Sequence, residues 1–184
     1  MLKSIAYLQT GNERQRRAYK AIVDLGILND LARYGPVLCG TIPIGIDVDG
    51  SDLDIIMKVE DFAKFTAIAT RLYGNHTGFQ VKSNIIREMP AIKVNFDFGG
   101  FPFELFGQPQ PVEAQHAYRH MLVEHRLLMK YPDLKNDVIR LKEQGIKTEP
   151  AFARILQLAG DPYDSLLTLG EAIRVSSRSG PSSR

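Results

Sequence analysis

Apolar residues recur every three or four positions in several segments, and this spacing predicts helices. The first predicted helix begins after Asn12, which can cap it while Gln15 reaches back to the cap. A short helix is expected over 27–31 and a longer one over 62–72. The expected core positions are Ala18, Ile22, Val23 and Leu25 in the first helix and Phe62, Phe65, Ile68 and Leu72 in the long one.

Between and after these helices the pattern predicts a mixed sheet. Short apolar runs at 36–38, 52–59 and 79–83 predict three strands. Residues 91–98 and 101–106 alternate around a Gly-Gly pair, which favours a tight hairpin turn. The alternation assigns Phe96, Phe98, Phe101, Phe103 and Leu105 to one face and Lys93, Asn95, Asp97 and Glu104 to the other.

Beyond residue 108 the pattern becomes helical, and prolines divide it into about four helices. The predicted fold class is therefore α/β in the α+β sense, a mixed β-sheet flanked by helices with a C-terminal helical annex. We expect a core over 1–108, a helical region over 109–174 and a disordered tail over 175–184, where Ser, Gly and Pro predominate.

Two acids lie at the start of the second predicted strand. Asp52 and Asp54 are two positions apart, so they project to the same side of a strand. Such a pair repels itself unless a cation lies between the carboxylates, and hard oxygen ligands suit Mg²⁺ shared with phosphates. A calcium loop that starts at Asp47 does not fit, because its required glycine and glutamate positions hold Asp52 and Lys58. A solvated acidic turn is the remaining structural alternative.

A third acid and a glycine turn complete a recognisable order of motifs. Leu38-Cys39-Gly40-Thr41 precedes the pair by about ten residues, and Phe103-Glu104-Leu105 follows it. This order resembles the DNA polymerase β-type nucleotidyltransferase superfamily, which implies a nucleotidyltransferase-like sheet. Gly160-Asp161-Pro162-Tyr163, with the segments at 7–12 and 40–47, further resembles an uncharacterised bacterial domain family within it.

The resemblance implies roles for individual residues. Asp52, Asp54 and Glu104 are the implied catalytic acids and would bind Mg²⁺ or Mn²⁺, which clamp the attacking and leaving oxygens at the α-phosphorus. The implied nucleotide-binding residues are Gly40, Thr41, Ser51 and Lys93. Backbone amides around a glycine turn form a concavity that suits phosphate oxygens, which supports the first two independently.

The turn departs from the superfamily pattern after Thr41. Many members carry a short helix with a basic residue there, whereas Pro43 and Gly45 argue against a regular helix in this chain. The charge that neutralises phosphates must then come from elsewhere. Lys93 is the candidate because it shares a face with Glu104, and a solvated lysine without a role is the alternative.

The predicted activity is transfer of a nucleoside monophosphate from an NTP, with ATP expected, to an unidentified hydroxyl-bearing acceptor, with release of pyrophosphate. Glu104 would also serve as base for the acceptor hydroxyl. The alternative from another class is a non-catalytic nucleotide-binding or antitoxin-like protein, with a possible protein partner. A transferase that labels a protein side chain would differ in its acceptor alone.

The composition bears on whether the protein binds nucleic acid and on its cellular location. The chain has 23 basic and 21 acidic residues, and removal of Arg178 and Arg184 in the expected tail leaves 21 of each. We therefore expect no electrostatic footprint for a nucleic-acid duplex. A single cysteine, Cys39, excludes an internal disulfide, and no apolar run suggests a membrane span or signal peptide. The expected location is the cytoplasm.

One helical face of the C-terminal region carries titratable residues at spacings of three and four: Glu113, His116, His120 and Glu124. A zinc signature is absent, and solvated histidines are more common than ligands. A contact between His116 or His120 and the acceptor is the functional alternative. Arg119 and Arg126 are expected to be solvated.

Overall fold

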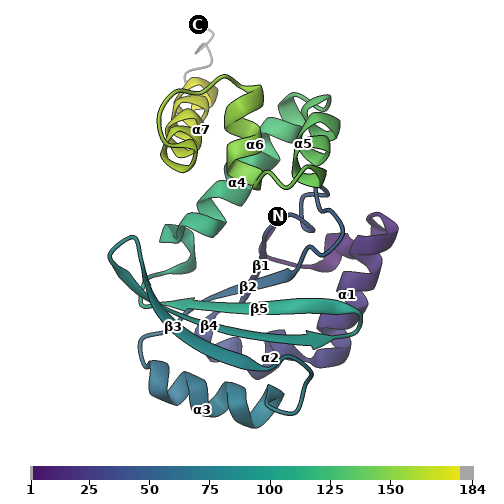
Figure 1. Cartoon of the computed structure of the whole chain (residues 1–184), viewed down its shortest axis with the longest axis vertical. Coiled ribbons are helices and arrows are strands. Elements are labelled where there is room, and N and C mark those ends of the chain that lie inside the picture. The colour runs from purple at the N-terminus through teal and green to yellow at the C-terminus, as the bar shows by residue number, and fades with distance from the viewer. Residues whose placement is uncertain (1, 179–184) are drawn as a thin grey trace, which may run out of the picture. The chain divides into compact units, whose positions relative to one another are not determined.

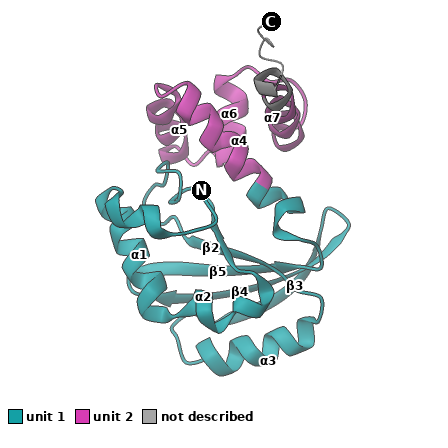
Figure 2. Ribbon diagram, turned by 180° about the vertical axis from the view of Figure 1, so that it is seen from behind, with its two compact units in different colours: residues 1–118 teal, residues 119–184 magenta. Residues whose placement is uncertain are grey.

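The computed structural model describes the backbone of residues 2–178 and the side chains of residues 2–173. The chain forms two compact units, residues 1–118 and 119–184 (Figure 2). The domain boundary predicted after residue 108 stays a prediction. The last six residues of the predicted tail, 179–184, lie outside the described part of the chain.

The first unit contains a five-stranded sheet (Figure 1). Its strands are β1 Val37–Cys39, β2 Leu53–Lys58, β3 Gln80–Ile86, β4 Met89–Phe98 and β5 Phe101–Gln108. They lie in the order β1-β2-β5-β4-β3, with β2 and β5 parallel and every other neighbouring pair antiparallel. The predicted mixed sheet is confirmed, and so is the Gly-Gly hairpin, in which Phe98 lies opposite Phe101.

Helices cover one face of this sheet. They are α1 Glu13–Leu25, α2 Ile27–Asp30 and α3 Phe62–Tyr73, and short 3-10 turns are η1 Ala6–Thr10, η2 Ala32–Tyr34 and η3 Val112–Ala114. Their buried residues join one core cluster with the alternate strand residues that include Leu53, Phe96 and Phe103. Phe96 stacks on Phe103 at 5.3 Å between ring centroids and on Tyr73 of α3 at 4.9 Å. Burial of these aromatic faces fixes which side of each strand is the polar side.

The first helix begins as the sequence predicts. The Asn12 side chain accepts from the Gln15 amide, and the Gln15 side chain accepts from the Asn12 amide, which forms a capping box. One predicted core position is wrong: Val23 is 51% exposed, whereas Ile22 is 1% exposed. The buried stripe of α1 consists of Ala18, Ala21 and Ile22, and Val23 lies about 100° beyond Ile22 around the helix, outside this stripe.

The second unit consists of helices. They are α4 His116–Lys130, whose first turn belongs to the first unit, α5 Leu134–Glu143, α6 Thr148–Ile155 and α7 Pro162–Arg178. Phe152 of α6 and Leu166 of α7 are fully buried. A Cβ on Gly170 would lie 2.1 Å from a methyl group of Val123, so glycine permits this close approach of α7 to α4. No described helix is long and apolar enough to cross a membrane.

Two neighbouring substitutions test the assignment of the α1 core face. We expect Ile22→Ala to lower the free energy of unfolding by about 2–5 kcal/mol, because it leaves a cavity in the core. Val23→Ala is the matched control, and its effect should stay within about 0.5 kcal/mol. Urea unfolding of both variants measures this, and equal losses would contradict the assignment.

Candidate functional site

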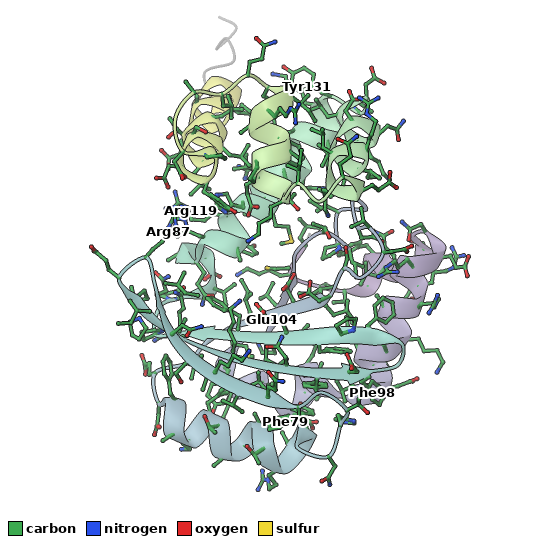
Figure 3. All side chains as sticks on the ribbon, viewed as in Figure 1. Phe79, Arg87, Phe98, Glu104, Arg119 and Tyr131 are labelled. Carbon is green, nitrogen blue, oxygen red and sulfur yellow. The ribbon has the colours of Figure 1, made fainter. Side chains whose placement is uncertain are left out.

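The site is built on one row of residues that crosses the sheet on the face opposite α1, α2 and α3. Cys39 pairs with Asp54, Asp54 with Glu104, Glu104 with Asn95 and Asn95 with Gln80, one residue from each strand. Directly opposed residues of neighbouring strands project to the same face, with strands about 4.8 Å apart. The register therefore places Asp54 and Glu104 side by side, and Glu104 is marked in Figure 3.

The glycine turn touches the acid pair. Gly40 follows β1 directly and has φ +82°, and a Cβ there would lie 2.1 Å from the Asp54 Oδ2 atom. Only glycine leaves room for that carboxylate and also tolerates this backbone angle without strain. The carboxylate and burial together raise the pKa of the neighbouring Cys39 thiol well above its ordinary value, with burial the larger cause. Cys39 is thus a buried free thiol.

The loop between β1 and β2 contains turns and no helix. Gly45 adopts φ +71°, and its amide donates to the Ile42 carbonyl at 3.1 Å, so the expectation of an irregular turn is confirmed. The Thr41 carbonyl accepts from the Ile46 amide at 3.1 Å. The Ser51 hydroxyl accepts from the Val48 amide at 2.9 Å, so this predicted nucleotide ligand closes its own loop.

Asp52 lies between Ser51 and the first residue of β2, two positions before Asp54. Its placement therefore depends on where the loop ends, whereas Asp54 and Glu104 lie within strands. Continuation of the β2–β5 register would set Asp52 opposite Pro102. Both aspartates are half-buried.

Lys93 lies against the third acid. Its Nζ donates to both carboxylate oxygens of Glu104, at 2.9 and 3.0 Å, and lies 5.6 Å from the centre of the Phe106 ring. Lys93 pairs with Phe106 in the sheet, so it reaches Glu104 along a diagonal between β4 and β5. The Lys93 and Glu104 side chains are 29% and 20% exposed, so this ion pair is only partly screened by water.

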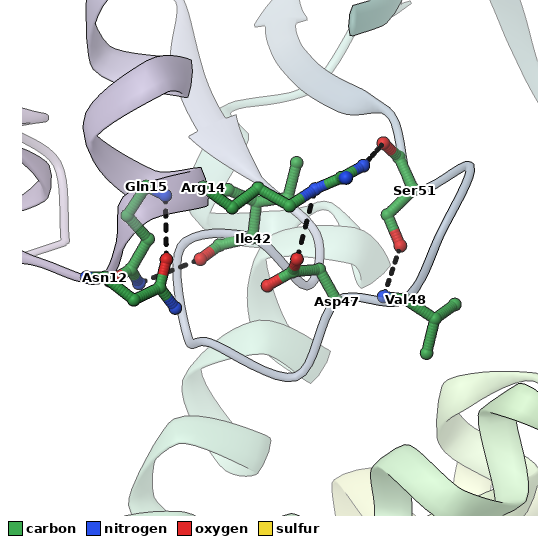
Figure 4. Close-up of polar contacts among 7 residues, drawn as sticks. All are labelled: Asn12, Arg14, Gln15, Ile42, Asp47, Val48 and Ser51. Carbon is green, nitrogen blue, oxygen red and sulfur yellow. Dashed lines mark hydrogen bonds and ion pairs between the residues drawn. The ribbon is translucent and has the colours of Figure 1, made fainter.

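Arg14 of α1 ties the loop to the helix, and the sequence reasoning missed it (Figure 4). Its Nε lies 3.1 Å from a carboxylate oxygen of Asp47, and its Nη2 donates to the Ser51 carbonyl at 3.1 Å. The guanidinium also lies 5.3 Å from the centre of the Phe101 ring. Arg14 thus fixes both sides of the turn that leads to Asp52. The sequence signal was the surplus of acids at 47–54, which needs a nearby cation.

Gln15 provides a second tie to the same loop. Its Nε2 donates to the Ile42 carbonyl at 2.9 Å while its Oε1 accepts from the Asn12 amide (Figure 4). The helix cap and the loop therefore share one side chain. This explains how a loop with a proline and several glycines keeps a defined course.

The donor set fits a hard divalent cation. Asp52, Asp54 and Glu104 supply carboxylate oxygens, and the space that a Cβ of Gly40 would fill is left to the Asp54 carboxylate. The described side chains do not form a ready group of three metal-binding residues. The Glu104 carboxylate instead faces the Lys93 ammonium, and ligation by Glu104 would require that contact to loosen.

The predicted face of titratable residues is corrected in one position. Glu113 lies in η3, and α4 begins at His116, so Glu113 is not part of that helix. Within the second unit, His120 is 4% exposed, with Nε2 2.9 Å from the Tyr163 carbonyl oxygen and Nδ1 3.6 Å from the Glu149 carboxylate. Arg119, which was expected to be solvated, donates to Glu171 at 3.0 Å in an exposed ion pair.

Comparison with solved structures defines the class of fold. The polymerase core of TRAMP, an RNA surveillance complex, has a TM-score of 0.53 at 14% identity over 88% of this chain and 50% of that chain. The GLD-2/RNP-8 complex gives 0.52 at 14% over 83% and 62%. The Cid1 poly(U) polymerase gives 0.50 at 16% over 71% and 40%. The chain has the polymerase β-type nucleotidyltransferase fold and spans 40–62% of the length of these chains.

A match to a protein-family model identifies the family of this chain. The model for "Domain of unknown function (DUF4269)" matches residues 20–169, most of the chain, and the protein belongs to this family. No curated protein matches it. The bacterial origin that the sequence resemblance implied stays a prediction.

The free energy of unfolding of two glycine variants tests the close approach of Gly40 to Asp54. Gly40 and Gly50 have almost the same φ, +82° and +81°, but a Cβ on Gly50 would have open space. Gly50→Ala should cost about 1–2 kcal/mol through backbone strain alone. We expect Gly40→Ala to cost at least about 1 kcal/mol more, since the Asp54 carboxylate must also move. Equal losses in urea unfolding would show that the carboxylate yields freely.

Burial in the second unit predicts a pH-dependent stability. Burial chiefly, together with the Glu149 carboxylate, raises the pKa of Glu124 from 4.5 to about 8, and Lys142 opposes the shift. The folded state thus holds a proton that the unfolded state releases above pH 4.5. Stability is full below that pH and falls as the pH rises toward about 8, by up to about 1.4 kcal/mol per pH unit.

Urea unfolding followed by circular dichroism between pH 5 and 8 measures this slope. Glu124→Gln should flatten it, because the amide cannot ionise, while Glu143→Gln at an exposed position of α5 should leave it unchanged. A slope that persists in Glu124→Gln would contradict its assignment to Glu124.

Proposed function

We propose that the protein is a nucleotidyltransferase that transfers a nucleoside monophosphate from an NTP, with Mg²⁺ or Mn²⁺, to a hydroxyl-bearing acceptor. The observation that carries the proposal is the pairing of Asp54 with Glu104 directly beside the glycine of the β1 turn. Two carboxylates fixed in neighbouring strands next to exposed turn amides suit a cation and phosphate together. A purely structural sheet face has no need for this arrangement.

The residues divide the work by position. Asp52, Asp54 and Glu104 would hold the metal ions, which supply charge for the developing oxyanions and the leaving pyrophosphate. The Gly40 and Thr41 amides would receive the triphosphate at the end of β1. The Lys93 ammonium would leave its ion pair with Glu104 and bind a phosphate oxygen instead. Glu104 would then be free to accept the proton of the acceptor hydroxyl. Ser51 would act through the loop shape.

A nucleotide thermal-shift panel tests the site. We expect ATP or another NTP to raise the melting temperature in the presence of Mg²⁺, and a ligand at about a hundred times its Kd stabilises by about 2.7 kcal/mol. UTP and AMP belong in the panel, the first because one solved relative is a poly(U) polymerase. The Asp52→Asn/Asp54→Asn variant should lose the shift because the metal ligands are gone.

The control is the same double substitution elsewhere, in Asp24 of α1 and in Asp133, the residue before α5, which are exposed acids outside the proposed site. This variant should keep the nucleotide response. A shift that is equal in both double variants, or independent of Mg²⁺, would overturn the site. Release of pyrophosphate on incubation with a lysate, lost in Glu104→Gln, would then establish turnover.

The second candidate is a non-catalytic nucleotide-binding or antitoxin-like protein that acts with a protein partner. The observation that favours it is the bidentate Lys93–Glu104 ion pair, which occupies both oxygens of the third acid. A pure binder would bind nucleotide with wild-type affinity in Glu104→Gln and release no pyrophosphate. A label from ATP that appears on protein would instead indicate a protein-modifying transferase.

A further inference from the structure

We infer a second ligand site at the opposite end of β2, for a small molecule with an apolar body and a phosphate or other multiply charged anionic group. The site is a cavity of about 740 Å³ in the first unit, between the start of β1, the end of β2 and the start of α3. Lys58 in its lining follows Asp54 by four residues, about 13 Å along the strand. The cavity is therefore separate from the proposed nucleotide site.

The lining combines an apolar wall with a charged rim. Pro36, Val37 and Val112 contribute apolar surface, and Tyr34 packs edge-to-face on the core residue Phe65 at 5.2 Å between ring centroids. That contact fixes one wall in place, because Phe65 is fully buried. The volume lies within the range of small-molecule sites, and an aromatic or other apolar group would cover this wall.

The charges around the cavity are not balanced. Glu113 forms an ion pair with Lys3, and Glu60 with Lys58 at 2.7 Å. The remaining acid of the cavity lining, Asp61, caps α3, because its side chain accepts a hydrogen bond from the backbone amide of Lys64 at 2.9 Å.

Two cations of the lining, Arg33 and Lys64, remain without a carboxylate partner among the described side chains. Arg33 precedes β1 and Lys64 follows β2 along the chain, and both line the cavity, so one anionic group in the cavity would be bound by both cations. Arg33 can donate two parallel hydrogen bonds to a phosphate, and Lys64 adds a point charge. A ligand with a doubly charged head and an apolar body matches both parts of the lining.

Phenyl phosphate is the probe, since it has both parts and cannot serve as an NTP. Amide chemical shifts of the full chain, recorded without metal, should move in 33–37 and 58–64 with a saturable dependence. Arg33→Gln/Lys64→Gln should weaken binding at least about fivefold, as expected from two lost charge-assisted contacts. The matched control Arg71→Gln/Lys135→Gln removes one exposed arginine and one exposed lysine outside the cavity and should stay within about twofold of wild type.

Two further ligands and one further variant separate the contribution of the charged group from that of the apolar wall, and this cavity from the nucleotide site. Inorganic phosphate and benzyl alcohol, each with one part of the probe, should both bind more weakly than phenyl phosphate. Asp52→Asn/Asp54→Asn should bind the probe like wild type, so failure of the nucleotide site would not affect this result. No saturable shift up to about 10 mM, or equal weakening in both double variants, would overturn the site. Equal binding of inorganic phosphate would overturn the apolar part.

Discussion

The parallel pairing of β2 with β5 is the constraint on which the proposed chemistry depends. It joins residues 50 positions apart and sets Asp54 opposite Glu104. A shift of one residue in this register would turn one acid toward the helices, because side chains alternate along a strand. The shift is opposed by the other face, where Leu53, Ile55 and Leu105 are fully buried in the core. Hydrophobic burial on one side thus holds two like charges together on the other.

A sheet fixes the positions of residues only within its strands, and Asp52 lies just before the first residue of β2. The position of Asp52 depends on the loop from β1, which has no helix to stiffen it. Two side chains of α1 hold the loop in place instead. Arg14 contacts Asp47 and Ser51, and Gln15 donates to the Ile42 carbonyl. Gln15 also completes the cap of α1, so the side chain that helps to begin the helix also positions the loop. Local helix stability and site geometry are therefore linked through one side chain.

Local signals in the sequence predicted most of the fold. Alternation around the Gly-Gly pair gave the β4–β5 hairpin and its faces, and Asn12 marked the start of α1, because each depends on residues close in sequence. The proximity of Asp54 to Glu104 came from family resemblance, since strand order is not encoded in periodicity. The contact of Arg14 with Asp47 was missed for the same reason, and Val23 was misplaced because a helical stripe has no sharp edge.

The charge balance of the site explains why a lysine belongs beside the third acid. Asp54 and Glu104 lie opposite each other in neighbouring strands and repel each other, and Lys93 compensates Glu104 through a contact on the same sheet face. In the proposed function Lys93 would change its partner from Glu104 to a phosphate oxygen, and its long side chain, which starts from β4 beside β5, allows this change without a backbone movement. A phosphate arriving with its own cation would replace the compensation that Lys93 gives to Glu104 and would itself attract the ammonium. In the proposed function the same residue would keep the acids together before a nucleotide binds and neutralise the nucleotide afterwards, a role that a glycine turn without a basic helix leaves to another element.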